Sequence, residues 1–162
     1  MSADTSERAY TVQHVTLVSD KNVDAVHDDL IEIVPILDVR LVEMLRAGDQ
    51  ALIAEQRKNG PKLWLFDTRD HGSLLAADGG PRKLWQFEIG NPLTAESMTR
   101  HKLAAGLYAP LRVVLYEDEH GRTVFEYDLP STLFGQFADE RVTCVAEDLD
   151  RELNEALHQA LR

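Results

Sequence analysis

The pattern of apolar and polar positions along the chain predicts an α+β domain. Strict alternation indicates a strand, whereas apolar residues that recur at helical spacing indicate a helix facing a core. On this basis we expect strands at residues 9–18, 62–68, 83–89, 111–118 and 122–129, and helices at residues 22–34, 40–58, 94–103 and 142–162. The turn Glu119-His120-Gly121 joins the last two strands in a hairpin. We therefore expect an antiparallel sheet with helices gathered on one face.

The helical region before the second strand contains one stop signal and one weak point. Apolar residues recur at helical spacing over residues 22–34, and Pro35 lacks a backbone donor, so this helix should end or kink there. A second apolar stripe covers residues 40–58, with Gly48 as its weak point. The pattern leaves open whether residues 22–58 form one bent helix or two.

Length and charge fit one acidic, soluble domain. The chain has 162 residues, enough for one hydrophobic core. We expect a flexible tail at residues 1–9 and a single domain at residues 10–162. The formal net charge of −11 repels nucleic acid and anionic membranes, so neither is expected as a partner.

Cysteine usage and the N-terminus bear on the compartment. Cys144 is the only cysteine, which excludes an intramolecular disulfide and a cysteine-based zinc site. It lies between Val142 and Val145 near the start of the last helix, where we expect a small buried residue. The first residues are polar, and no apolar run approaches the ~18 residues of a membrane span. A cytoplasmic protein is therefore predicted.

Three short segments carry a resemblance to a known family. They are RDHGSLLAADG, the corner IGNP after a hydrophobic strand, and APLRVVLYEDEHGRTVFEYDLPSTL. Over roughly residues 10–160 the chain resembles the family catalogued as domain of unknown function family 302. The residues that match its motifs are Asp70, His71, Gly90, Asn91, Pro92, Pro110, Leu111 and Pro130. Ile89, Ala109 and Asp128-Leu129 depart from its pattern.

The resemblance implies a fold but no activity. It implies a curved antiparallel sheet packed against helices, similar to the TATA-binding-protein-like fold. The family has no settled activity, and a fold does not supply one. Function must therefore be argued from individual residues.

His71 is the strongest single candidate for chemistry. Asp70 could hold its imidazole in one tautomer for acid–base catalysis or metal binding, and Gly72 leaves room for a ligand. The alternative is a loop histidine that caps backbone groups. No HxxxH or HExxH spacing is present, so we expect neither a metal ion nor a cofactor.

Five further residues could contact a small molecule. The Asn91 amide could reach a ligand beside Gly90, although these residues also suit a tight exit from a strand. His101 lies in a basic group at the end of the short helix, where cations suit the helix dipole or an anion could bind. Trp64 and Trp85 lie in strands and could line an apolar pocket if both faced the concave side of the sheet.

These observations favour a binding module over an enzyme. The leading hypothesis is a small-molecule-binding or interaction domain that forms a homodimer. One alternative is an enzyme or metal-binding protein that uses His71 with Asp70. The other is a purely structural homo-oligomeric domain, and the sequence identifies neither a ligand nor a dimer surface.

Overall fold

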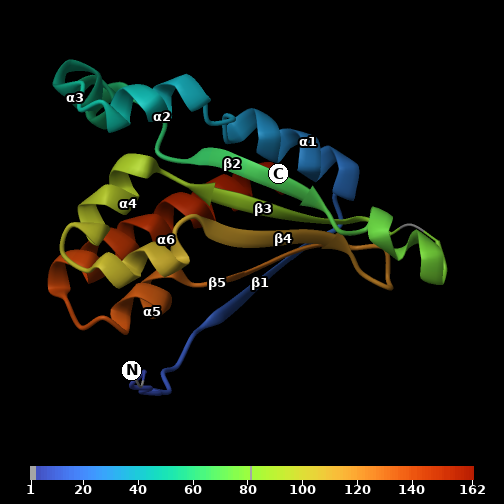
Figure 1. Ribbon diagram of the computed structural model, residues 1–162. Helices are drawn as coiled ribbons and strands as arrows, with labels where there is room; N and C mark the ends of the chain where they lie inside the picture. Colours follow the sequence, from blue (N-terminus) through green and yellow to red (C-terminus); the bar gives the residue numbers. More distant parts are fainter. Residues whose placement is uncertain (1–2, 81) are drawn as a thin grey trace.

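The computed structural model describes residues 3–80 and 82–162 (Figure 1). The strands are β1 (His14–Ser19), β2 (Trp64–Asp70), β3 (Leu84–Gly90), β4 (Leu111–Glu117) and β5 (Thr123–Asp128). The α-helices are α1 (Val23–Ile33), α2 (Val39–Arg46), α3 (Gln50–Asn59), α4 (Pro92–Thr99), α5 (Pro130–Gly135) and α6 (Glu140–Ala160). Two 3-10 helices, η1 (Ser73–Asp78) and η2 (Leu103–Tyr108), follow β2 and α4.

The five strands form one antiparallel sheet in the order β1-β5-β4-β3-β2. Strands β2 and β3 pair with each other, as do β4 and β5, while β1 pairs with β5 at the edge. The β2–β3 register places Trp64 opposite Gly90 at one end and Asp70 opposite Trp85 at the other. The predicted antiparallel sheet and its final hairpin are therefore confirmed.

Helices α1 and α6 pack together against one face of the sheet and enclose the core (Figure 1). Helix α1 ends at Ile33, just before Pro35, as the missing backbone donor predicts. Large side chains that are fully buried in this layer are Val26, Leu30, Phe87, Leu115, Phe125, Leu153 and Leu157. Apolar burial on this scale is the main stabilising contribution in a domain of this size.

Residues 22–58 contain the helices α1, α2 and α3, which is neither the one bent helix nor the two helices that the sequence left open. The region predicted as one helix at residues 40–58 is two helices, because Gly48 adopts a positive φ of 76° and interrupts the helical backbone. The carboxylate of Asp49 then accepts a hydrogen bond from the Leu52 amide at 3.0 Å and caps α3. Neither helix contains a fully buried residue. The pair therefore adds little to the core.

Several local predictions need correction. Strand β1 begins at His14, later than the predicted start at residue 9. Helix α4 begins at Pro92 because Asn91 caps it. Helix α5 and the two 3-10 helices were not predicted, and at six residues each they are too short to show a clear period. Cys144 is exposed and not buried, because it follows the buried Val142 by two positions and therefore lies on the opposite side of the helix.

Candidate functional site

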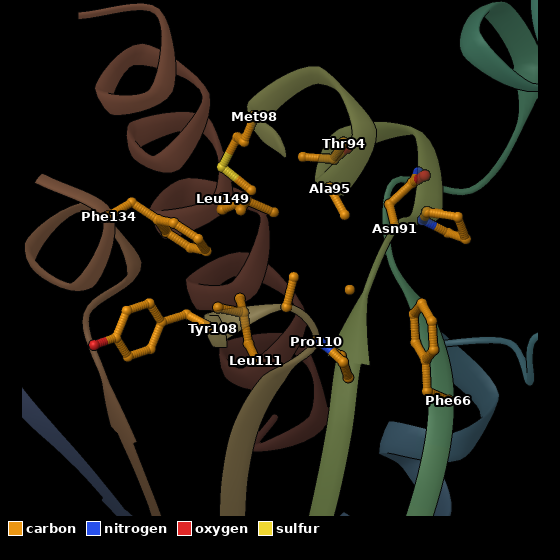
Figure 2. A pocket seen from close by; sticks show the side chains of 13 residues that line it. Phe66, Asn91, Thr94, Ala95, Met98, Tyr108, Pro110, Leu111, Phe134 and Leu149 are labelled. Carbon is orange, nitrogen blue, oxygen red and sulfur yellow. The ribbon is translucent and has the colours of Figure 1, made fainter. Parts of the chain in front are cut away.

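Two of the three family-like segments meet at one end of the sheet and line an apolar cavity of about 80 Å³ (Figure 2). The corner Gly90-Asn91-Pro92 forms one wall, and the segment Ala109-Pro110-Leu111 that enters β4 forms another. The remaining lining residues come from distant parts of the chain: Phe66, Thr94, Ala95, Met98, Tyr108, Phe134 and Leu149. The fold thus brings separate sequence motifs to one cavity.

Asn91 fixes the corner beside this cavity. Its side-chain oxygen accepts a hydrogen bond from the Leu93 amide at 2.9 Å and so caps α4. Its side-chain amide donates to the carbonyl oxygens of Pro61 and Lys62 at 3.1 and 3.2 Å. The polar atoms of Asn91 are therefore occupied by the protein, while its side chain contributes surface to the cavity.

Gly90 leaves space in the wall of the cavity. Its φ lies outside the positive range that favours glycine, so residues with a side chain can adopt the same backbone conformation. A Cβ atom at this position would lie 3.6 Å from Pro110 and 3.7 Å from Phe66, which is ordinary van der Waals contact. Neither strain nor a clash requires a glycine here, and its missing side chain enlarges the cavity.

The cavity is apolar in character. Met98 and Phe134 are almost completely buried in its wall. The Tyr108 ring packs edge-on against Phe134, with 6.0 Å between ring centroids, and its hydroxyl is directed to the hydroxyl of Tyr10 at 2.6 Å. Carboxylates, imidazoles and thiols are absent from the described lining. The cavity therefore suits an apolar group.

A larger groove of about 810 Å³ lies beside the cavity, between the helix pair α2–α3 and helix α4. Phe66 and Pro92 line both spaces, so the two adjoin. Across the groove the carboxylate of Glu96 accepts from Arg100 and, at 3.0 Å, from Arg57. The hydrogen bond from Arg100, reinforced by Arg57, holds the pKa of Glu96 below its usual value.

His71 and Asp70 lie at the opposite end of β2 from the cavity. Trp64 pairs with Gly90 and Asp70 pairs with Trp85, so the two ends are about 20 Å apart at the usual rise per residue. The Asp70 carboxylate accepts from the Ser73 amide at 2.9 Å, and no hydrogen bond joins it to the His71 ring in the described chain. A catalytic role for this pair stays a prediction.

The other predicted site residues are dispersed. Trp64 adjoins the cavity corner and lines a small space with Asn91 and helix α2, whereas the Trp85 ring lies 4.7 Å from His27 of helix α1. The two indoles thus do not share a pocket. His101 is exposed beyond the end of α4.

Sequence reasoning missed most of the cavity and groove. In the sequence, several residues that line the cavity look like ordinary core residues: Phe66, Met98, Tyr108, Phe134 and Leu149. The one usable signal was the basic group around His101, which includes Arg100, and the fold brings Arg100 together with Arg57 at Glu96.

Two other kinds of site are absent from the described residues. Those residues hold no group of three or more His, Cys, Asp or Glu side chains arranged to bind a metal ion. None of their helices combines the length and the apolar character needed to cross a bilayer.

The fold and the cavity define a small α+β domain with an apolar site at one end of an antiparallel sheet. The family model described as domain of unknown function DUF302 matches residues 53–160, and the chain belongs to this family. Its fold is similar to the crystal structure of an uncharacterized conserved DUF302 protein from Bacillus stearothermophilus, with a TM-score of 0.65. The two are 18% identical, and the match covers 92% of this chain and 98% of that chain. No functionally curated protein matches this chain.

Proposed function

We propose that this protein binds a small molecule through an apolar group that enters the cavity at the Gly90 corner. The observation that carries this proposal is the cavity itself, where two family-like motifs meet and a glycine leaves space that a methyl group would fill. At about 80 Å³ the cavity is smaller than the roughly 150 Å³ cavity that accommodates benzene. It therefore takes the end of an aliphatic chain and excludes larger ring systems.

Octan-1-ol is a suitable first probe because it is neutral and carries a flexible apolar chain. The Met98 methyl group lines the cavity, whereas Met44 is exposed on α2, so methyl NMR can separate local binding from general association. We expect octan-1-ol to shift the Met98 methyl resonance in a saturable way. Uniform shifts of both methionines, or none at saturation, would contradict the proposal.

Gly90→Ala is the sharpest test of the cavity. The new methyl group lies in ordinary contact with Pro110 and Phe66 and occupies ligand space, so the protein should fold while octan-1-ol affinity falls about tenfold. Gly135→Ala is the matched control, because a Cβ there meets nothing within 4 Å. Equal affinity of the two variants would show that the ligand does not use the Gly90 wall.

We also propose the predicted homodimer as the assembled form. Helix η2 exposes Leu103 and Leu107, two residues that are 88% and 75% accessible. Large exposed apolar side chains are typical of interaction surfaces when they lie together. Sedimentation velocity should show a dimer for the native protein and a monomer for the Leu103→Glu, Leu107→Glu variant; a native monomer would contradict this part. The likeness to the TATA-binding-protein fold stays a prediction.

A further inference from the structure

The groove beneath α2 and α3 has an apolar floor that no part of the described chain fills. Val42, Leu45 and Ile53 line it from the helix pair, and Phe66 and Leu93 line it from the body of the domain. None of these five side chains is fully buried. The apolar stripes of α2 and α3 therefore face a space of about 810 Å³ instead of a packed core.

The rim of the same groove is positively charged. Three arginines line it, Arg46, Arg57 and Arg100, against the single carboxylate of Glu96. Glu96 pairs with Arg57 and Arg100, whereas no ion pair among the described residues involves Arg46. The rim thus has an excess of positive charge on a chain whose formal net charge is −11. Such a local reversal of sign favours an anionic ligand.

The groove adjoins the cavity. Phe66 and Pro92 line both spaces, and Phe66 is 37% exposed between them. Figure 2 shows the Phe66 ring at the side of the cavity, below Asn91. The two spaces therefore share an apolar border made by Phe66 and Pro92. Helix α2, which contributes Val42, Leu45 and Arg46 to the groove, lies outside the residues that match the family model.

We propose that groove and cavity together bind one single-chain anionic amphiphile, such as a free long-chain carboxylate. Its headgroup is held by Arg46, Arg57 and Arg100, and its chain passes beneath α2 and α3 toward the Gly90 wall. Guanidinium groups bind carboxylates through strong, charge-assisted hydrogen bonds. This inference rests on the proposed function and adds the class of ligand.

The first experiment compares dodecanoate with dodecan-1-ol by titration calorimetry, with both kept monomeric in solution. The two share one apolar chain and differ in the charge of the headgroup. We expect dodecanoate to bind at least about tenfold more tightly, as one charge-assisted hydrogen bond implies. Equal affinities would overturn the headgroup assignment and leave the octan-1-ol cavity intact. Failure of both dodecyl compounds and of octan-1-ol would overturn the proposed function as well.

Charge variants locate the headgroup. Arg46→Gln should lower dodecanoate affinity about tenfold and leave dodecan-1-ol affinity unchanged. Arg112→Gln is the matched control, because Arg112 is exposed on β4 and also lacks an ion pair among the described residues. Equal effects of the two changes would show a general charge effect and overturn the site.

Glu96→Gln gives a result of opposite sign. It frees Arg57 and Arg100 from their carboxylate, so dodecanoate should bind several-fold more tightly even if the variant is less stable. A merely structural role for Glu96 predicts weaker binding instead, and that result would overturn the assignment. Binding to vesicles of anionic phospholipid, without binding of monomeric dodecanoate, would overturn it in favour of a membrane surface.

Discussion

Helices α6 and α2 begin with the same local arrangement and lie in different surroundings. Each starts with an aspartate whose side chain accepts a hydrogen bond from the amide two residues later, Asp139 with Arg141 and Asp38 with Arg40. In each pair the arginine also bonds the carboxylate. Yet α6 buries seven residues and α2 buries none. Capping determines where a helix begins, whereas the available apolar partners determine whether it joins the core.

The difference indicates a division of roles between the two helical regions. Helix α6, with α1, encloses the core and contributes buried apolar side chains that stabilise the domain. Helices α2 and α3 keep their apolar side chains beside a groove, where a ligand can reach them. If this division is correct, substitutions in α6 should mainly lower the free energy of unfolding, whereas substitutions in α2 or α3 should mainly weaken ligand binding.

Truncation of a buried leucine in α6 should produce the largest effect. Leu153 is fully buried, so Leu153→Ala should lower the free energy of unfolding by ~2–5 kcal/mol through lost burial and a residual cavity. Leu45→Ala removes the same atoms from α2, where they line the groove, and should cost less than about 1 kcal/mol while weakening dodecanoate binding. Urea denaturation followed by circular dichroism measures both changes. Comparable losses in the free energy of unfolding would show that α2 belongs to the core and that the two helices do not differ in this respect.

Hydrogen exchange should separate the two regions without a mutation. Amides of α6 should exchange only through global unfolding, whereas those of α2 and α3 should open locally at a free-energy cost several kcal/mol lower. Dodecanoate should slow exchange in α2 and α3 and leave α6 nearly unchanged, because the ligand lies beneath the helix pair. Protection of α2 equal to that of α6 in the free protein would contradict this expectation.

The elements of the fold that could be predicted from sequence are those with a strong local cause. Pro35 ends α1 because it has no backbone donor, and the five strands follow from alternation and turn residues. Gly48 was visible as a weak point, but whether it would bend or break the helix depends on its positive φ, which sequence does not specify. Cys144 was placed wrongly because it lies between apolar neighbours in the sequence, whereas the buried face of α6 includes Val142 and Ala146 and excludes Cys144.

The candidate site was harder to predict because its parts are far apart in the chain. Gly90 and Asn91 were singled out, yet no local pattern connects them with Phe66, Met98 or Phe134, which become neighbours only when the sheet and α4–α6 pack. The same holds for Arg46 and Arg100, which belong to different helices. Local sequence determines caps and turns, whereas a cavity depends on tertiary packing that those signals do not contain.

The smallest expected effect concerns the two capping aspartates and depends on pH. The side-chain hydrogen bond from Arg141 lowers the pKa of Asp139 from 3.8 to about 2. Because the folded-state pKa is depressed, the ionised carboxylate stabilises the fold at pH values above 3.8, and this contribution is lost as the pH falls through about 2. Asp139→Asn keeps a capping side chain but removes the charge. It should therefore destabilise the protein near neutral pH, by less than Leu153→Ala, and the difference from the native protein should vanish in strong acid.

Asp38→Asn applies the same change to α2, where Arg40 likewise lowers the aspartate pKa. If α2 lies outside the cooperative core, this variant should leave global unfolding unchanged at every pH and only increase local opening of α2. Urea denaturation from about pH 6 down to about pH 2 measures the first property, and hydrogen exchange measures the second. A pH-dependent loss of global stability in Asp38→Asn, equal to that of Asp139→Asn, would mean that the two helices are energetically equivalent despite their different burial. The groove would then be part of the cooperative fold, and a ligand bound there would have to stabilise the whole domain against unfolding.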